Sequence, residues 1–339
     1  MNTQIQKPLF IYTLFSSLGD FIVMGDLIHK VETIIPGAKA IAVHRNNPHI
    51  KQWKYPDPAS HFYNAYSLSA LLDLMKRCQE YRKQGYTVFG IQQAPGSLQG
   101  FFFLKTLKRL GVLDYVVDFN LYNADIITPS EGNYILDLHL NQLKKILKTP
   151  MNIQHQRLAL PYVFNPSLKP KDDSSQLCIG IHPWSSRDNP TFTWSFPKWM
   201  DVIKRITIKN ERIKIIIFGK NKNFEKFKKY LEQELPSAKS IHFAPSASIQ
   251  ELTETVAHVD VLVSVNTSVV HIGYALNKRM VILCGPTLNF WIPKGENSEV
   301  LMDERASLPG SDKLISNNQF PRVENISTDQ VVTCIEKFL

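Results

Sequence analysis

The stretch "SVNTSVVHIGYALNKRMVILCGPT", residues Ser264–Thr287, decides the fold. It reads as the end of an apolar strand, an Asn-Thr-Ser turn, a helix with one histidine, a second apolar strand and a Gly-Pro-Thr stop. Strand, tight turn, helix and strand in this order form the repeating unit of parallel sheets with helices on both faces. We therefore expect an α/β protein.

The same stretch predicts a binding pocket for a polar group. The turn runs from Asn266 into Thr267 and Ser268, and one of the last two is the expected N-cap of the helix. The first N–H groups of that helix, including that of Val269, would be free to bind an anion such as a phosphate. His271 lies in the first turn, where it either contacts the same anion or supports the turn.

Length and composition restrict the class of protein. The chain has 339 residues, of which 44% are hydrophobic and 20% charged, which is typical of two globular domains. No apolar run reaches the length of a membrane span, and Pro8–Phe15 is better explained as a first buried strand than as a signal peptide. The four cysteines are widely spaced and predict neither a disulfide framework nor a metal site. We expect a cytoplasmic protein.

The formal net charge of +9 raises the question of a nucleic-acid partner. Many basic residues fall between Lys204 and Lys229, where they are interleaved with acids and a buried-type strand. This pattern is typical of solvated helix faces, and no nucleic-acid-binding signature is present, so we expect no nucleic-acid partner. A basic surface leaves open a peripheral, salt-sensitive contact with the inner face of the cytoplasmic membrane.

Apolar runs and helical segments alternate along the whole chain. In the first half the pattern predicts strands over 8–15, 38–45, 86–92 and 114–120, with helices over 18–33, 67–84, 98–110 and 131–148. The segment 46–64 is predicted to be a long loop. Residues 165–176, rich in Pro, Lys, Asp and Ser, are the predicted linker.

The pattern restarts after the linker. It predicts strands over 177–183, 213–219, 240–243, 261–265 and 280–284, with helices over 197–208, 223–234, 248–259, 268–276 and 328–338. We therefore expect two Rossmann-like domains facing each other across a cleft, over residues 1–165 and 177–325. The last segment, 326–339, is long enough to pack back on the N-terminal domain.

Ligands of such sheets bind beyond the carboxyl ends of the strands, so the residues that follow each strand are the candidates. Asp20 follows the first strand, where it is either a general base or a carboxylate stabilised by the helix dipole. Ser185, Ser186 and Arg187 follow the strand at 177–183 and could hold a diphosphate. No GxGxxG fingerprint follows any strand, which argues against a nicotinamide-dependent dehydrogenase.

Three motifs resemble glycosyltransferase family 9, which includes heptosyltransferases that use ADP-heptose. They are "LGD" at 18–20, "IHPWSSRDNPTFTWSFPKW" at 181–199 and "VDVLVSVNTSVVHIGYALNKRMVILCGPT" at 259–287. The last is the specific one, and with matching element order the resemblance spans nearly the whole chain.

The resemblance implies a GT-B fold and an inverting transferase that needs no metal or other cofactor. Its substrates would be a nucleotide-diphosphate sugar, such as ADP-heptose, held by the C-terminal domain, and a lipopolysaccharide or related glycan acceptor, held by the N-terminal domain. It implies that Asp20 is the general base and that Ser185, Ser186, Thr267, Ser268 and His271 line the donor diphosphate. Glu225 would be the counterpart of a ribose-binding acid.

The chain departs from the family pattern at three places. Asn266 and Ser268 stand where the family has Asp and Gly. The family's lysine just before the tryptophan at position 194 is missing, and Phe192 and Thr193 occupy that region. Arg187 or Lys198 is a candidate replacement for that positive charge. These departures leave two readings open: a transferase for heptose or another hexose-like sugar, and a non-catalytic nucleotide- or glycan-binding protein on a degenerate transferase scaffold.

Overall fold

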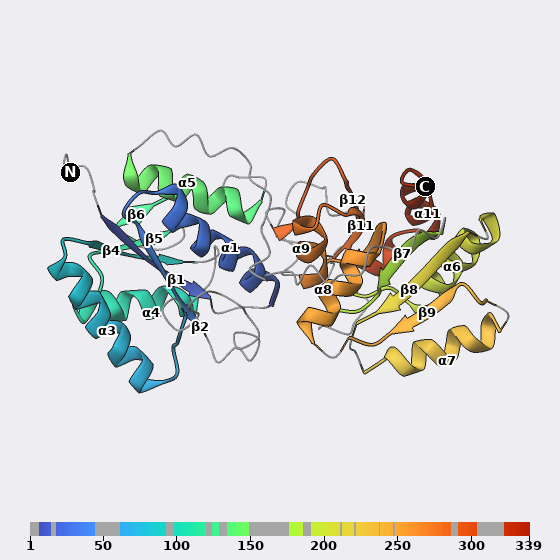
Figure 1. Ribbon diagram of the computed structural model, residues 1–339, viewed down its shortest axis with the longest axis horizontal. Coiled ribbons are helices and arrows are strands. Elements are labelled where there is room, and N and C mark those ends of the chain that lie inside the picture. Colours follow the sequence, from blue (N-terminus) through green and yellow to red (C-terminus); the bar gives the residue numbers. More distant parts are fainter. Residues whose placement is uncertain are drawn as a thin grey trace. The chain divides into compact units, whose positions relative to one another are not determined.

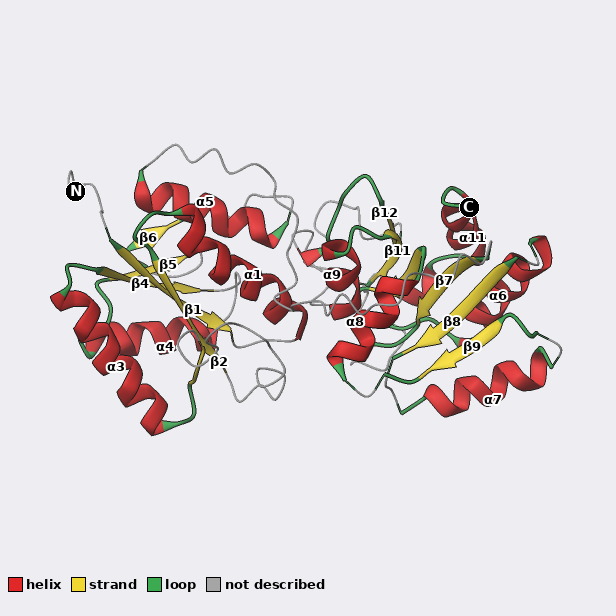
Figure 2. Cartoon of the chain, in the orientation of Figure 1, coloured by secondary structure: helices red, strands yellow, loops and turns green. Residues whose placement is uncertain are grey.

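The computed structural model describes residues 7–14, 18–44, 62–92, 98–119, 124–128, 134–148, 176–185, 191–210, 212–219, 222–236, 238–246, 248–285, 291–303 and 322–339. The chain divides into two compact units, Met1–Val163 and Phe164–Leu339. Each unit holds one parallel six-stranded sheet with helices on its faces (Figures 1 and 2). The predicted fold class, α/β with two Rossmann-like domains, is therefore confirmed.

The N-terminal unit has the sheet order β3-β2-β1-β4-β5-β6, which is that of a Rossmann fold. Its elements are β1 (Pro8–Leu14), α1 (Leu18–Ile34), β2 (Lys39–His44), β3 (Phe62–Asn64), α3 (Leu68–Lys83), β4 (Thr87–Gln92), α4 (Leu98–Arg109), β5 (Tyr115–Asp118), β6 (Ile126–Ile127) and α5 (Ile135–Leu147).

Alternation along β1 divides the core of this unit between the two faces of the sheet. Leu9 and Ile11 belong to an apolar cluster that includes residues of α3 and α4, whereas Tyr12 packs edge-on against His139 of α5 on the other face. All seven residues of β1 are buried, as expected of a central parallel strand. The predicted first strand is therefore confirmed over Pro8–Leu14.

The C-terminal unit repeats the same strand order, β12-β11-β10-β7-β8-β9. Its elements are β7 (Leu177–His182), α6 (Phe196–Lys209), β8 (Ile213–Phe218), α7 (Phe224–Glu234), β9 (Ile241–Ala244), α8 (Ile249–His258), β10 (Val261–Val265), α9 (Ser268–Ala275), β11 (Arg279–Cys284), β12 (Ser298–Met302), a 3-10 turn (Val323–Asn325) and α11 (Thr328–Glu336).

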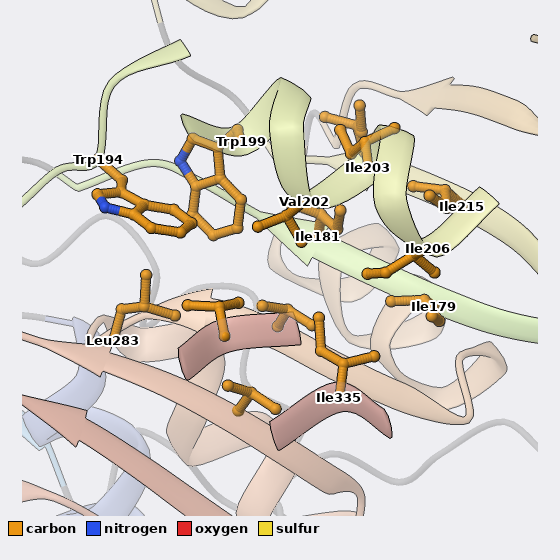
Figure 3. Packing of buried hydrophobic residues seen from close by; sticks show 14 of the residues in the cluster. Ile179, Ile181, Trp194, Trp199, Val202, Ile203, Ile206, Ile215, Leu283 and Ile335 are labelled. Carbon is orange, nitrogen blue, oxygen red and sulfur yellow. The ribbon is translucent and has the colours of Figure 1, made fainter. Parts of the chain in front are cut away.

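The core of this unit lies between the sheet, α6 and α11, as Figure 3 shows. In Figure 3, Ile181 of β7 lies beside Val202 of α6, and Ile179 lies beside Ile206. Trp199 is fully buried, and its ring meets that of Trp194 edge-on at 5.1 Å between centroids. Trp194 and Trp199, both within the motif at 181–199, are therefore core residues.

Helix α11 contributes to the core of the C-terminal unit. Its Val331, Val332 and Ile335 are buried in the same cluster as α6. Arg205 of α6 pairs with Asp329 at 2.6 Å. That the same segment also packs back on the N-terminal domain stays a prediction, because an amphipathic pattern does not show which surfaces a helix covers.

Three further strands were not predicted: β3, β6 and β12. β3 falls at the end of the predicted loop 46–64, the rest of which lies outside the described residues. The predicted linker also lies outside them, except for its last residue, Gln176. All three strands are at sheet edges. No helix in the described part of the chain is long and apolar enough to cross a membrane.

Candidate functional site

The carboxyl edge of the C-terminal sheet gathers small polar groups. The chain leaves β7 toward β8 and β9, then returns with β10 to the other side of β7. The ends of β7 and β10 therefore form the topological switch point, where doubly wound sheets bind ligands. His182 ends β7, and Asn266 and Thr267 follow β10.

The amino end of α9 is the first component of the site. Thr267 is its N-cap, with extended φ and ψ of −146° and −175°, but its side chain does not cap the helix. Its Oγ1 atom is buried and has no hydrogen-bond partner among the described residues. A buried hydroxyl costs free energy unless it is paired, so this position favours a ligand that can pair with it. The first N–H groups of α9 start at the same point.

The other predicted residues of this turn have different surroundings. The N–H of Asn266 donates to the carbonyl oxygen of Leu283 at 2.9 Å, which ties the turn to β11. Ser268 is half-buried, whereas Val269 is 1% exposed and belongs to the core. Val269 can therefore offer a ligand only its backbone.

His271 is buried on α9, and burial lowers its pKa to about 4. The imidazole is consequently neutral near pH 7. It can donate or accept a hydrogen bond at the site, but it does not supply a positive charge to a phosphate.

His182 is a site residue that sequence reasoning missed. Its Nδ1 lies 3.4 Å from the Oγ of Ser264, and that Oγ donates its single proton to the carbonyl oxygen of Val265 at 2.8 Å. The Nδ1 atom must therefore be the donor of the pair, which leaves Nε2 with a lone pair. Burial lowers the pKa of His182 to about 3, so this neutral tautomer persists near pH 7.

Gly219, directly after β8, makes room for His182 and Trp184. Its φ is +110°, and a Cβ atom there would lie 2.8 Å from Cδ2 of His182 and 2.9 Å from Cδ1 of Trp184. The Nε1 of Trp184 donates to the carbonyl oxygen of Phe218 at 2.9 Å. Only glycine fits here, because the backbone conformation and the two rings both exclude a side chain.

Ser185 and Ser246 add two hydroxyls at the same edge. Ser185 is 9% exposed and follows Trp184. Ser246, after β9, is 6% exposed, and its Oγ has no partner within the described parts of the chain. Its N–H donates to the carbonyl oxygen of Gly219 at 3.4 Å. Sequence reasoning missed Ser246 because the link to Gly219 exists only in the folded sheet.

The structure gives less support to the remaining predicted site residues. Ser186 and Arg187 lie outside the described residues. Glu225 is the second residue of α7 and is exposed. Lys198, a candidate replacement for the family's lysine, has other partners: its Nζ donates to the carbonyl oxygens of Glu324 and Ile326.

The N-terminal sheet has its own polar edge. Asp20 is the third residue of α1, directly beyond β1, although its side chain lies outside the described part. His44, Gln92 and Asp118 end β2, β4 and β5, and they are 7%, 0% and 0% exposed. Buried polar groups at strand ends are a further signal of a binding edge, and the sequence shows them as single polar residues that close apolar runs.

Comparisons with known proteins agree with this architecture. The family model of glycosyltransferase family 9, described as heptosyltransferase, matches residues 131–319, more than half of the chain. A search of curated proteins found no match.

Solved structures resemble the chain over nearly its full length. A glycosyl transferase family 9 structure from Veillonella parvula has a TM-score of 0.71 at 15% identity and covers 100% of this chain and 98% of its own. Heptosyltransferase WaaC of E. coli, solved with ADP-2-deoxy-2-fluoro heptose, has a TM-score of 0.65 at 14% identity, covering 98% and 100%. The E. coli ADP-heptose lps heptosyltransferase II has a TM-score of 0.61 at 15% identity, covering 98% of both chains. At these identities the likeness shows the fold, which is GT-B.

Proposed function

The chain belongs to glycosyltransferase family 9 and is therefore a glycosyltransferase, and from this premise we propose the reaction it performs. It transfers a sugar from a nucleotide-diphosphate donor to a lipopolysaccharide core, a lipooligosaccharide or a related surface glycan. The reaction inverts the anomeric carbon and requires no metal. The sugar is heptose or another hexose-like sugar.

The start of α9 is the observation that carries this proposal. A helix amino end attracts anions through its free N–H groups and its dipole. Thr267 adds a buried hydroxyl without a partner in the described residues. Such preorganised donors stabilise the charge that develops on a leaving diphosphate, which a metal ion would otherwise have to do.

In this proposal residues 177–325 bind the donor. Ser185, Ser186 and Arg187 contact the diphosphate from one side, and the turn from Asn266 to Val269 contacts it from the other. His271 supports that turn as a neutral hydrogen-bonding group, and Glu225 binds the ribose.

Residues 1–165 bind the acceptor. Asp20 accepts the proton of the attacking hydroxyl as it adds to the anomeric carbon, and the nucleoside diphosphate leaves from the opposite face. This is general-base catalysis of a single displacement, which produces inversion.

Two structures of one relative support the nature of the donor. The WaaC structures hold ADP and an ADP-heptose analogue, which favours a nucleoside diphosphate sugar for this chain as well. Asn266 is uncharged where the family has an aspartate, so we expect its contact with the donor sugar to differ from that of the family.

Thermal unfolding with nucleotides tests the donor site. ADP, UDP, GDP and CMP are each added at about 1 mM, and a ligand at about 100 times its Kd should stabilise by about 2.7 kcal/mol, a shift of several degrees. We expect a shift with one nucleoside diphosphate and a smaller shift in Thr267→Val, which keeps the shape of the side chain but removes the hydroxyl. Equal changes in Tm in wild type and Thr267→Val would show that the Thr267 hydroxyl does not contact the nucleotide.

Asp20→Asn tests the chemistry separately. The variant should keep the nucleotide shift and lose sugar transfer, because the amide cannot accept the proton. Retained turnover would refute the assignment of the base. Transfer that disappears after treatment with EDTA and returns with a divalent cation would refute metal independence.

A further inference from the structure

The amino-terminal ends of α3 and α4, together with Tyr66 just before α3, expose a set of large apolar side chains. Nine such side chains are exposed in the described part of the chain, and five of them lie here. Tyr66 and Leu68 are 70% and 73% exposed, Leu72 is 57% exposed, and Leu98 and Phe102 are 50% and 62% exposed. We call these five residues the apolar tip.

The two helices that carry the apolar tip lie on the same face of the N-terminal sheet. Residues of both contribute to one apolar cluster beneath them. At their far ends Arg82 of α3 donates to the carbonyl oxygen of Gly111 and pairs at 2.6 Å with Asp114, both of which follow α4. Each helix follows a strand of the same parallel sheet, so both begin at its carboxyl edge. Their exposed first turns therefore belong to one end of the unit (Figure 1).

Basic residues continue the exposed stripes away from the tip. On α3 the stripe of Leu68 and Leu72 continues to Lys76, and on α4 the stripe of Leu98 and Phe102 continues to Arg109. With a rise of about 1.5 Å per residue, Lys76 lies about 6 Å along the helix from Leu72, and Arg109 about 10 Å from Phe102.

The charge of the two helices is strongly one-sided. They carry seven basic residues and two acidic ones, Asp73 and Glu80, which gives a net charge of +5. Arg82 and Lys108 are in ion pairs with Asp114 and Asp125. Helix α4 has no acidic residue.

We propose that the apolar tip and the basic residues behind it form a docking surface for an anionic lipid bilayer. Interfacial segments immerse apolar side chains to a depth of about 5–10 Å, while basic groups remain at the level of the head groups. The separation along each helix matches this depth, and the net charge of +5, or +3 when Asp114 and Asp125 are counted, complements anionic head groups. If the acceptor is lipid-linked, as the proposed function has it, the surface also lies at the sheet edge where α1 brings Asp20.

Sedimentation with lipid vesicles tests the apolar part of this surface. The full chain is mixed with vesicles of phosphatidylglycerol and phosphatidylcholine in equal amounts, or of phosphatidylcholine alone. We expect binding to the mixed vesicles only, reduced at least about tenfold in Leu72→Ser/Phe102→Ser. Leu110→Ser is the matched control, because Leu110 is 59% exposed but follows the opposite end of α4, and it should bind as wild type does.

A charge variant tests the basic part. In Lys76→Gln/Arg109→Gln the affinity for the mixed vesicles should fall roughly 25-fold, and wild-type binding should disappear in 0.5 M NaCl. All variants alter exposed positions, so their thermal unfolding should match that of wild type.

Three outcomes would overturn the proposal. They are wild type that does not sediment with anionic vesicles, Leu72→Ser/Phe102→Ser that binds as wild type does, and equal binding to neutral vesicles. A dimer that Leu72→Ser/Phe102→Ser converts to monomer, without vesicle binding by wild type, would assign the surface to a second copy of the chain instead. None of these measurements depends on transferase activity.

Discussion

Replacing Gly219 with alanine should destabilise the C-terminal unit for two separable reasons. The first is backbone strain, since a φ of +110° costs a residue with a side chain about 1–3 kcal/mol. The second is crowding, since the added Cβ would lie 2.8 Å from His182 Cδ2 and 2.9 Å from both His182 Nε2 and Trp184 Cδ1.

Neither ring can move away from the added Cβ without losing packing or a hydrogen bond. Trp184 is 5% exposed and hydrogen-bonded to the carbonyl oxygen of Phe218, and His182 is 8% exposed and bonded to Ser264. Overpacking of such a site costs about 1–3 kcal/mol. Together the two effects predict a loss of about 2–6 kcal/mol, or roughly 5–15 °C in Tm for a unit of this size.

Gly111→Ala is the matched control for Gly219→Ala. Gly111 has a φ of +72°, but nothing lies within 4 Å of its added Cβ, so the control carries strain of about 1–2 kcal/mol without crowding. Urea unfolding followed by circular dichroism gives both values. A difference between the two variants smaller than about 0.5 kcal/mol would refute the packing of His182 and Trp184 around Gly219.

Three further predictions concern the same unit. Gly285→Ala would bring a Cβ within 2.3 Å of the backbone oxygen of Thr191, so urea unfolding should show a loss of about 2–4 kcal/mol, and unchanged stability would contradict this close approach. Burial lowers the pKa of His271 to about 4, so between pH 7 and 5 the unfolded chain binds a proton that the folded chain excludes. The free energy of unfolding should therefore fall by about 2 kcal/mol over this range because of His271 alone. In His271→Gln it should fall by that much less, and an identical pH dependence in the variant would show that His271 titrates normally. Asp303 accepts the N–H of Arg322 at 3.1 Å and the amide of Asn325 at 2.6 Å, so Asp303→Ala should cost about 1–3 kcal/mol in urea unfolding, whereas Asp303→Asn retains an acceptor and should cost less.

The central strands and most helices could be predicted because their physical causes are local. A fully buried parallel strand such as Pro8–Leu14 reads as a largely apolar run. A helix such as Ile249–His258 begins where Ser248 and Glu251 form a reciprocal cap. Edge strands lack this signal: β6 has two residues, and every residue of Ser298–Met302 is only half-buried.

The sequence predicted only those parts of the candidate site that lie within a single loop. The turn around Thr267 can be recognised from neighbouring residues, and the structure adds the buried hydroxyl that lacks a partner. The role of His182 depends on Ser264, 82 residues later, and on the absence of a side chain at Gly219. Such long-range conditions have no signature in a sequence window. The assignments of Asp20, Arg187 and Glu225 remain predictions.

The way the last residues are fastened to the C-terminal unit determines when that unit can fold during synthesis. Trp194 donates to the carbonyl oxygen of Ile326, and the N–H of Ser195 donates to Glu324, so residues about 130 positions apart meet at the start of α6. On a ribosome the N-terminal unit has all its strands before the second unit is begun, and domains generally fold as they emerge. The core of the second unit lacks the apolar side chains of α11 until that helix leaves the exit tunnel. A nascent chain therefore exposes the apolar surface of α6 until then, and such exposed surface makes a partly folded chain prone to aggregation.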